Sequence, residues 1–364
     1  MTGQGILDLL EAYHGEVDGE PVQITDTDLI EQIRASGHMK ATIIRVSAKI
    51  QLERNKTRDR REMMTPIQRR RDMAREAIVE NLLEKTDIHH IHSVLALCGL
   101  PYKRTPDEQM HYIREYGKSS LVVQAGFLKH PDSGKIFAQG LPYGPKARLL
   151  LLHICTRAMR QQSPVVDLEN SLSAFIESMG VHKCGGKRGS FKQFKEQINR
   201  LAACRMQIGL WNGSRSVTIN TQPISRLDLW LPQNPDQKML WNSSVTLSHD
   251  FYESLQQHAL PVDIRALSAL SHSAKQMDIL LWLSYRLKEL KKPYFLTWDL
   301  MKEQFCHSPE RRMILFQNQF REDIRDIEEI FDKRLPLELS DKGLTLKPCD
   351  PEGLFVPPEK HLPK

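Results

Sequence analysis

The chain contains two histidines and two tyrosines of the kind that some enzymes use to cleave a phosphodiester bond. One apolar residue separates His90 from His92, and Tyr112 and Tyr116 follow downstream. A metal held by such a histidine pair polarises a phosphate, which a tyrosine hydroxyl then attacks. The pair shares one metal on a strand, where alternate side chains point the same way. Residues 87–97 instead predict a helix, so a tyrosine nuclease of the rolling-circle type is a minor alternative, and we expect no enzymatic activity.

Two further kinds of site chemistry are disfavoured. Around the glycine-rich segment HKCGGKRGS, Gly180 and Gly185 have the spacing of a phosphate loop, but Gly186 stands where that loop needs lysine, so we expect no ATP hydrolysis. The six cysteines have neither a CxxC pair nor zinc-ligand spacing. We therefore expect no metal, no cofactor and a reduced, cytoplasmic setting.

The residue types of a DNA-reading helix follow Ser190, the expected N-cap. At about 100° per residue, one face is apolar: Phe191, Phe194, Ile198, Leu201 and Ala202. The opposite face carries side chains that can read base edges, and the preceding glycine-rich segment can hold a phosphate. The predicted DNA contacts here are Lys183, Lys187, Arg188, Ser190, Lys192, Gln193, Lys195, Asn199, Arg200 and, in the following hairpin, Arg215. The alternative is an ion-paired solvent face, since Lys192, Glu196 and Arg200 are spaced i, i+4, i+8.

This helix lies in a segment that the chain repeats. Residues 151–157 align with 280–286, and residues 194–201 align with 320–327 at nearly the same offset. Each copy predicts three helices followed by a hairpin, and Asn212-Gly213 between two β-prone runs is a strong hairpin signal. That order is typical of a winged helix. The second copy adds predicted DNA contacts at Arg311, Arg312, Asn318, Arg321 and Arg325, whereas acidic residues follow at 326–329.

Positive charge is segregated along the chain in a way that its net charge of +6 conceals. Residues 45–75 carry 11 basic and 4 acidic side chains, and residues 142–230 carry 13 and 5. Such blocks are typical of proteins that bind a polyanion. For the first block we expect a non-specific DNA arm centred on Arg69, Arg70 and Arg71. A solvated charged helix and a site for an acidic host protein are the alternatives.

The remaining signals set the architecture. No apolar run is long enough to span a membrane, and the start of the chain lacks the pattern of a secretory signal. Thr65, Pro66 and Gln68 predict a capped helix start, and two apolar stretches around 130–134 predict a hairpin. The expected fold is α+β, mainly α, with two tandem winged-helix domains after a basic helical N-terminal region. The predicted parts are an acidic segment of helix and loop (1–44), the basic helical region (45–118), the first winged-helix domain with its preceding hairpin (119–232), the second (238–349) and a disordered tail (350–364).

Four segments resemble the RepA-type plasmid replication initiators. They are LPYGPKARLLLLHICTRAM (141–159), SLSAFIESMGV (171–181), GGKRGSFKQFKEQINRLAACRMQIG (185–209) and LPVDIRALSALSHSAKQMDILLWLSYRL (260–287). The resemblance covers roughly residues 120–350 and leaves the first 115 or so unmatched. It implies a tandem winged-helix protein that binds direct repeats, or iterons, in the double-stranded DNA of a plasmid origin.

The resemblance also implies partners. Initiators of this kind open A·T-rich DNA with host DnaA, help load the replicative helicase and often dimerise to repress their own promoter. A bacterial cytoplasmic, plasmid-associated location is therefore expected. A winged-helix transcriptional repressor without a replication role fits the same DNA-binding residues and is the main alternative.

Overall fold

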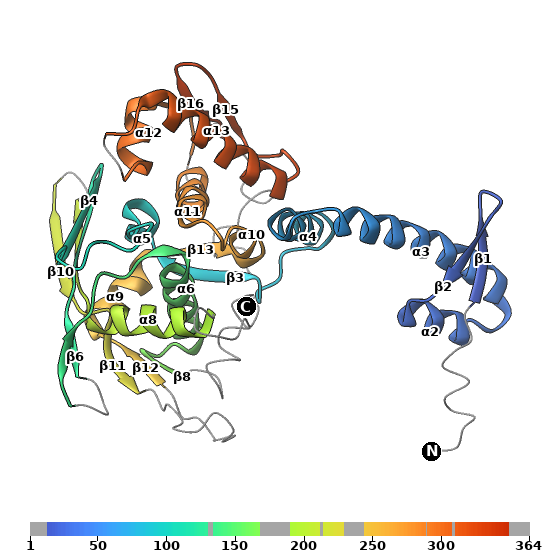
Figure 1. Ribbon diagram of the computed structural model, residues 1–364, viewed down its shortest axis with the longest axis horizontal. Coiled ribbons are helices and arrows are strands. Elements are labelled where there is room, and N and C mark those ends of the chain that lie inside the picture. The colour runs from blue at the N-terminus through green and yellow to red at the C-terminus, as the bar shows by residue number, and fades with distance from the viewer. Residues whose placement is uncertain are drawn as a thin grey trace. The chain divides into compact units, whose positions relative to one another are not determined.

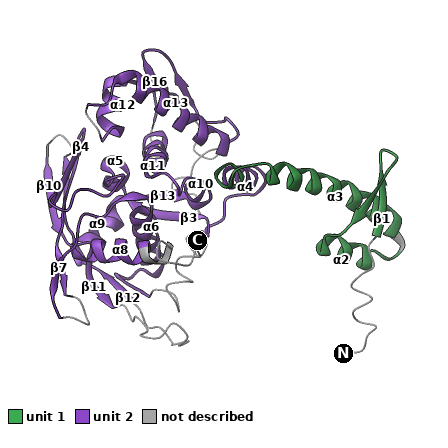
Figure 2. Ribbon diagram, in the orientation of Figure 1, with its two compact units in different colours: residues 1–69 green, residues 70–364 purple. Residues whose placement is uncertain are grey.

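The computed structural model describes residues 13–129, 134–167, 190–211, 214–228, 244–288, 290–307 and 310–348. The chain divides into two compact units, residues 1–69 and 70–364 (Figure 2). The boundary falls inside the segment 45–118, and both repeat copies belong to the second unit. Helices and strands are mixed throughout this unit (Figure 1). No helix among the described residues is long and apolar enough to cross a membrane.

The first unit is a hairpin packed on helices, so the helix and loop expected over residues 1–44 are only part of the fold there. Its turn is Asp18-Gly19, where both residues have positive φ, as a tight hairpin turn requires. Its small core includes Ile24, Leu29 and Ile33, each at most 1% exposed. Its elements are β1 (Tyr13–Val17), β2 (Glu20–Ile24), α2 (Thr27–Ala35), η2 (Gly37–Met39) and α3 (Lys40–Glu62).

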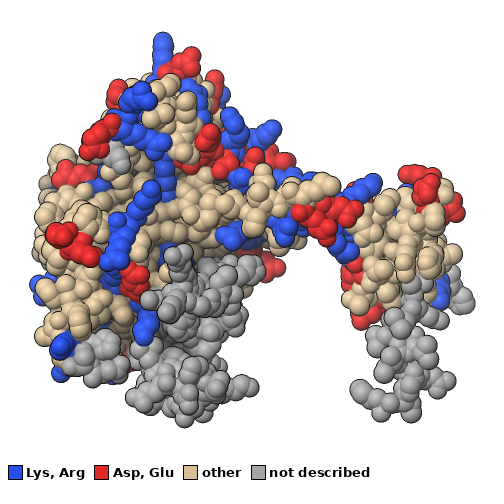
Figure 3. Space-filling model, in the orientation of Figure 1, with Lys and Arg blue, Asp and Glu red and all other residues tan. Residues whose placement is uncertain are grey.

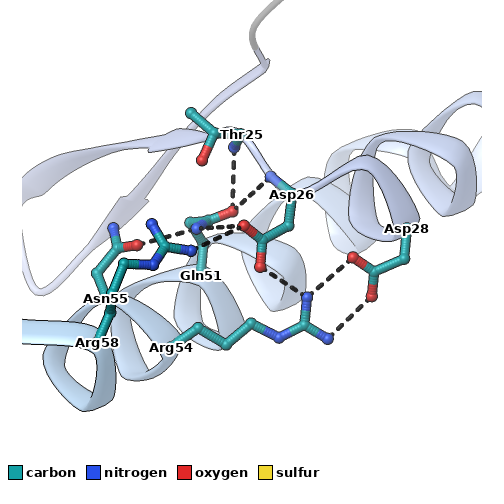
Figure 4. Close-up of polar contacts among 7 residues, drawn as sticks. All are labelled: Thr25, Asp26, Asp28, Gln51, Arg54, Asn55 and Arg58. Carbon is teal, nitrogen blue, oxygen red and sulfur yellow. Dashed lines mark hydrogen bonds and ion pairs between the residues drawn. The ribbon is translucent and has the colours of Figure 1, made fainter. Parts of the chain in front are cut away.

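A buried glutamine fixes α2 against α3 (Figure 4). The Gln51 side chain is fully buried, and its Oε1 accepts hydrogen bonds of 3.0 Å from the backbone N–H groups of Thr25 and Asp26. The Asp26 carboxylate accepts from Gln51, Arg54 and Arg58. The Arg54 guanidinium lowers the pKa of Asp26 through the hydrogen bond that it donates. Part of the basic block is therefore neutralised within its own unit.

The next helix, which begins inside this unit and continues past residue 69, starts as predicted. Gln68 N–H donates to Thr65 Oγ1, and Thr65 N–H donates to Gln68 Oε1, which together form a capping box. The helix, α4 (Pro66–Glu80), ends four residues before the expected Glu84.

The helix predicted over 87–97 is wrong. Residues Ile88–His92 form strand β3, and only Ser93–Cys98 form a helix, α5. β3 pairs antiparallel with β13 (Ala259–Asp263), far along the chain. That long-range pairing, with Ile91 2% exposed on the inner side, decides the conformation of a short apolar run that is ambiguous by itself.

The hairpins predicted around 130–134 and at Asn212-Gly213 are present, with residues 130–133 and 212–213 outside the described residues. The second hairpin does not stand alone, because β9 also pairs with β5 in a four-stranded sheet of order β10-β9-β5-β4. The strands are β4 (His111–Tyr116), β5 (Ser119–Gln124), β6 (Phe127–Lys129), β7 (Ile136–Ala138), β9 (Arg205–Trp211) and β10 (Ser216–Thr221).

The aligned segments of the repeat form helices in the same order. In the first copy they lie in α6 (Gly144–Gln161) and α8 (Ser190–Ala203). In the second they lie in α11 (Ala274–Lys288) and α13 (Met313–Ile330). The expected middle helix of the first copy, 171–181, lies outside the described residues, and its counterpart is α12 (Trp298–Phe305).

The two copies differ in how their strands pair. β14 (Tyr294–Thr297) pairs with β16 (Gly343–Leu346), which also pairs with β15 (Leu337–Leu339), so the second copy closes on its own hairpin. In the first copy β8 (Val165–Asp167) pairs with β12 (Ser244–Leu247), which also pairs with β11 (Ile224–Asp228). The winged-helix assignment therefore stays a prediction for both copies.

One hydrophobic core runs through both copies rather than one core in each. Buried residues of α6, α8, α11 and α13 belong to it, together with the connecting elements α9 (His249–His258) and α10 (Ile264–Ala269). A buried ion pair also joins the first helices of the copies. Arg148 Nε of α6 lies 2.6 Å from Asp278 Oδ1 of α11, and the two side chains are 3% and 7% exposed.

Candidate nucleic-acid interface

Helix α8 is held by the apolar face that the sequence predicts. Phe194, Ile198 and Leu201 are fully buried, and the aligned Phe320, Ile324 and Ile327 of α13 are also fully buried. The two helices therefore pack through equivalent positions. Each leaves a polar face away from the core, which is the geometric requirement for reading a groove.

The polar face of α8 is populated as predicted at some positions. Gln193 is exposed, and Lys195 and Asn199 are half-buried. Gln193 contacts the Lys146 amine of α6, so the N-terminal end of α6 adds a cation beside this face. Sequence reasoning missed Lys146, although it lies in the segment 141–159 that carries the family resemblance.

The predicted orientation of Arg200 is wrong. Its side chain is buried, pairs with Glu196 at 2.9 Å and donates a 3.0 Å hydrogen bond to the Leu141 carbonyl. It also lies over the Tyr143 ring, 5.2 Å from the centroid. Gly140 leaves the room for it, because a Cβ there would lie 2.3 Å from Arg200 Nη1. Arg200 therefore fastens α8 to the segment before α6 and is withdrawn as a base contact.

Several predicted contacts cannot be placed. Lys183, Lys187 and Arg188 lie outside the described residues, as do the side chains of Ser190 and Lys192. Ser190 is the first residue of α8. Arg215 is exposed in the turn between β9 and β10, at the end of the hairpin.

In the second copy, exposed basic residues lie just before α13 and along it. Arg311 and Arg312 are exposed just before the helix, and Asn318 and Arg325 are exposed along it. Arg321 is half-buried, since it lies 4.9 Å from the centroid of the Trp298 ring and donates a 3.0 Å hydrogen bond to the Ser340 carbonyl. The first four are thus better placed than Arg321 to reach a ligand.

The three arginines predicted to form a DNA arm have other partners. Arg71 is buried and pairs with Asp326 and with Glu329, the latter at 3.6 Å, near the C-terminal end of α13. Arg70 donates a 2.7 Å hydrogen bond to Ser271 Oγ. Arg69 remains exposed and donates a hydrogen bond of 2.9 Å to the Arg61 carbonyl. For Arg71 the arm prediction is therefore wrong, because the acids of α13 hold it in the fold.

The histidine pair lies on a strand, so the helical argument against a shared metal fails. The contacts of His92 supply a different one. Its Nδ1 accepts from the Val94 N–H at 3.2 Å, its Nε2 lies 2.8 Å from Ser254 Oγ, and burial lowers its pKa to about 3. Both ring nitrogens are thus engaged within the protein. No group of three or more His, Cys, Asp or Glu among the described residues is arranged to hold a metal ion.

The tyrosines are also committed to the fold. Tyr112 Oη lies 3.3 Å from His307 Nε2, and burial raises the pKa of its hydroxyl. Tyr116 Oη accepts hydrogen bonds from Arg286 at 2.6 Å and from Trp282 at 3.4 Å. Trp282 and Trp298 are buried, so both pack in the core and neither is placed to stack on a DNA base. Burial raises the pKa of the Cys98, Cys155 and Cys204 thiols to about 12, which disfavours reactive thiolates.

The comparison with family models agrees with the resemblance seen in the sequence. Residues 141–300 match the family model described as plasmid encoded RepA protein. Two crystal structures of domains 2 and 3 of RctB are similar to this chain over 73% and 72% of its length and 96% and 98% of theirs, at 11% and 10% identity and TM-scores of 0.43 and 0.44. No curated relative matches the chain.

Proposed function

Because residues 141–300 match the family model described as plasmid encoded RepA protein, we propose that this chain initiates plasmid replication by binding direct repeats in the origin. In this proposal it binds double-stranded DNA sequence-specifically through α8 and α13. It then helps open the neighbouring DNA and recruits host DnaA and the replicative helicase. These last steps, and repression of its own promoter as a homodimer, rest on the family alone.

The observation that carries the DNA-binding proposal is the equivalence of α8 and α13. Among the described residues, each follows a helix and a short strand and precedes a two-stranded hairpin, and both bury aromatic and aliphatic residues at aligned positions. Both also present amide and basic side chains on the outer face, among them Gln193 and Asn318. Two such helices on one chain suit a long, directly repeated site, because each can enter one of two successive major grooves.

Binding to origin repeats tests this proposal with one variant for each helix. Gln193→Ala/Lys195→Ala changes α8, and Asn318→Ala/Arg325→Ala changes α13. Each lost base contact is worth about 1–3 kcal/mol, so affinity for an origin repeat should fall about 5- to 150-fold per contact, with a smaller loss on scrambled duplex.

The matched control is Lys291→Ala/Lys292→Ala, an exposed pair beyond the C-terminal end of α11. It should bind the repeat like the wild type in fluorescence anisotropy at fixed salt. If both helix variants also match the wild type, α8 and α13 do not read the DNA. Specific binding at a lone palindrome and nowhere in tandem repeats would instead point to a repressor.

Nuclease activity is not part of this proposal. The contacts of His92, Tyr112 and Tyr116 described above support a structural role for each residue. Origin DNA incubated with the protein and Mg²⁺ or Mn²⁺ should remain uncut. A covalent protein–DNA adduct that disappears in Tyr112→Phe or Tyr116→Phe would overturn this part of the account.

A further inference from the structure

A hollow lies between the two repeat copies. It has a volume of about 740 Å³ and is lined by the segment that joins α5 to β4, by Pro145 of α6, by the start of α11, and by α13 with its preceding loop. Its lining includes Lys103 from the segment between α5 and β4, and Arg311 and Gln319 from the second copy. The sequence pattern gave no sign of this hollow, because its walls come from segments far apart in the chain.

The exposed charge at the hollow is positive. Lys103 and Arg311 are both exposed. Among the described residues that line it, Asp323 is the one carboxylate, and Lys275 pairs with it at 2.7 Å. That internal pair leaves Lys103 and Arg311 as the cations available to an anion.

Two aromatic rings of the lining are stacked on each other and uncharged. The Tyr102 and His307 rings are stacked, with centroids 3.6 Å apart and planes 2° from parallel. Burial lowers the pKa of His307 to about 3, so the ring is neutral near pH 7. The lining thus combines two exposed cations with a stacked, uncharged aromatic pair, a combination that suits an extended anion.

The hollow is continuous with both helices of the proposed interface. Pro145 lines it, and the next residue, Lys146, contacts Gln193 of α8. On the other side, Gln319 belongs to α13 and Arg311 lies just before that helix. Figure 3 shows Lys and Arg side chains in a line on one face of this unit, from the region of α12 and α13 toward α8.

We propose that this hollow receives the DNA phosphodiester backbone between the two grooves entered by α8 and α13, with Lys103 and Arg311 each pairing with a phosphate. The inference rests on the proposed function. Two successive major grooves on one face of a duplex are separated by the minor groove and the phosphates that border it. A basic hollow between two groove-entering helices therefore faces those phosphates, and the bound backbone fixes the spacing of the two helices without reading sequence.

The salt dependence of binding tests the hollow separately from the helices. Each phosphate contact contributes about −0.9 to the slope of log K against log salt. Lys103→Ala/Arg311→Ala removes two such contacts and should flatten that slope by about 1.8. When salt rises from 50 to 200 mM, the fold-loss of affinity should therefore be about 12 times smaller for the variant than for the wild type. The preference for origin repeat over scrambled duplex should persist. Lys291→Ala/Lys292→Ala should leave the slope unchanged.

Phosphate ethylation interference supplies the second readout, with full-length protein and an origin repeat. Interference at phosphates between the two major-groove contacts should be present with the wild type and lost with Lys103→Ala/Arg311→Ala. An unchanged slope or unchanged interference, while repeat preference is intact, overturns the hollow and leaves the proposed function standing. If the wild type itself shows no preference for the origin repeat over scrambled duplex, the proposed function is overturned instead.

Discussion

Asp278 is the one carboxylate among the described residues that pairs with the buried guanidinium of Arg148. The Arg148 guanidinium donates two hydrogen bonds of 2.6 Å to the Asp278 carboxylate. Its other hydrogen bonds reach the carbonyl oxygens of Leu100, Pro101 and Gly144. Replacing Asp278 by leucine leaves a buried cation with neutral acceptors only. Removal of one partner of such a pair costs about 3–5 kcal/mol, and we expect Asp278→Leu to fall in this range.

Arg148→Met should cost less stability than Asp278→Leu, because the Asp278 carboxyl that is left behind can take up a proton and lose its charge. Burial already raises the pKa of Asp278 despite the adjacent guanidinium, and Arg148→Met removes that guanidinium. The lone carboxyl then takes up a proton in the folded state, since its folded pKa lies above the unfolded value of 3.8. The penalty of Arg148→Met is therefore greatest at high pH and shrinks as the pH falls. The penalty of Asp278→Leu persists over the same range.

Urea denaturation at pH 8 and pH 5, followed by the fluorescence of buried tryptophans such as Trp282, measures both effects. The double variant Arg148→Met/Asp278→Leu should be more stable than Asp278→Leu alone, because it leaves no unpaired buried charge. If the two single penalties add in the double variant, or if Asp278→Leu costs less than about 1 kcal/mol, the pair does not carry the role assigned to it.

Three other changes test separate parts of the structure. Burial lowers the pKa of His92 and His153 from 6.5 to about 3, so the free energy of unfolding should fall as the pH drops below 6.5. Each ring contributes up to about 1.4 kcal/mol per pH unit, and His92→Gln should flatten this pH dependence in urea denaturation. Gln51→Ala leaves two backbone N–H groups without their acceptor and should destabilise the first unit by about 1–3 kcal/mol, seen as faster hydrogen exchange in α2. Arg71→Ala should lower the melting temperature more than Arg69→Ala, and an equal effect would contradict the buried contacts of Arg71.

The sequence predicted the local features of the fold well. The capping box at Thr65 and Gln68 needs only neighbouring residues, and the structure contains it. The apolar spacing of α8 and α13 predicted which face each helix buries. The Asp18-Gly19 turn was missed, although an Asp-Gly pair between β-prone runs favours a hairpin.

What the sequence did not predict depends on partners far along the chain. The strand over 88–92 forms because residues 259–263 pair with it. Arg71 is buried because carboxylates at 326 and 329 meet it. Arg200 points inward because Gly140 and Tyr143, on another segment, make a place for it. Helical periodicity at Arg200 gives no information about those residues, so the candidate site lost one of its predicted contacts.

Hydroxyl-radical footprinting of the full-length protein on its plasmid origin tests the central claim most directly. The account predicts protection of tandem direct repeats, with two protected stretches in each repeat about one helical turn apart. Gln193→Ala/Lys195→Ala should remove one stretch, and Asn318→Ala/Arg325→Ala should remove the other. Uniform protection of any DNA, or repeats whose protection neither variant changes, would contradict the claim that α8 and α13 bind the origin.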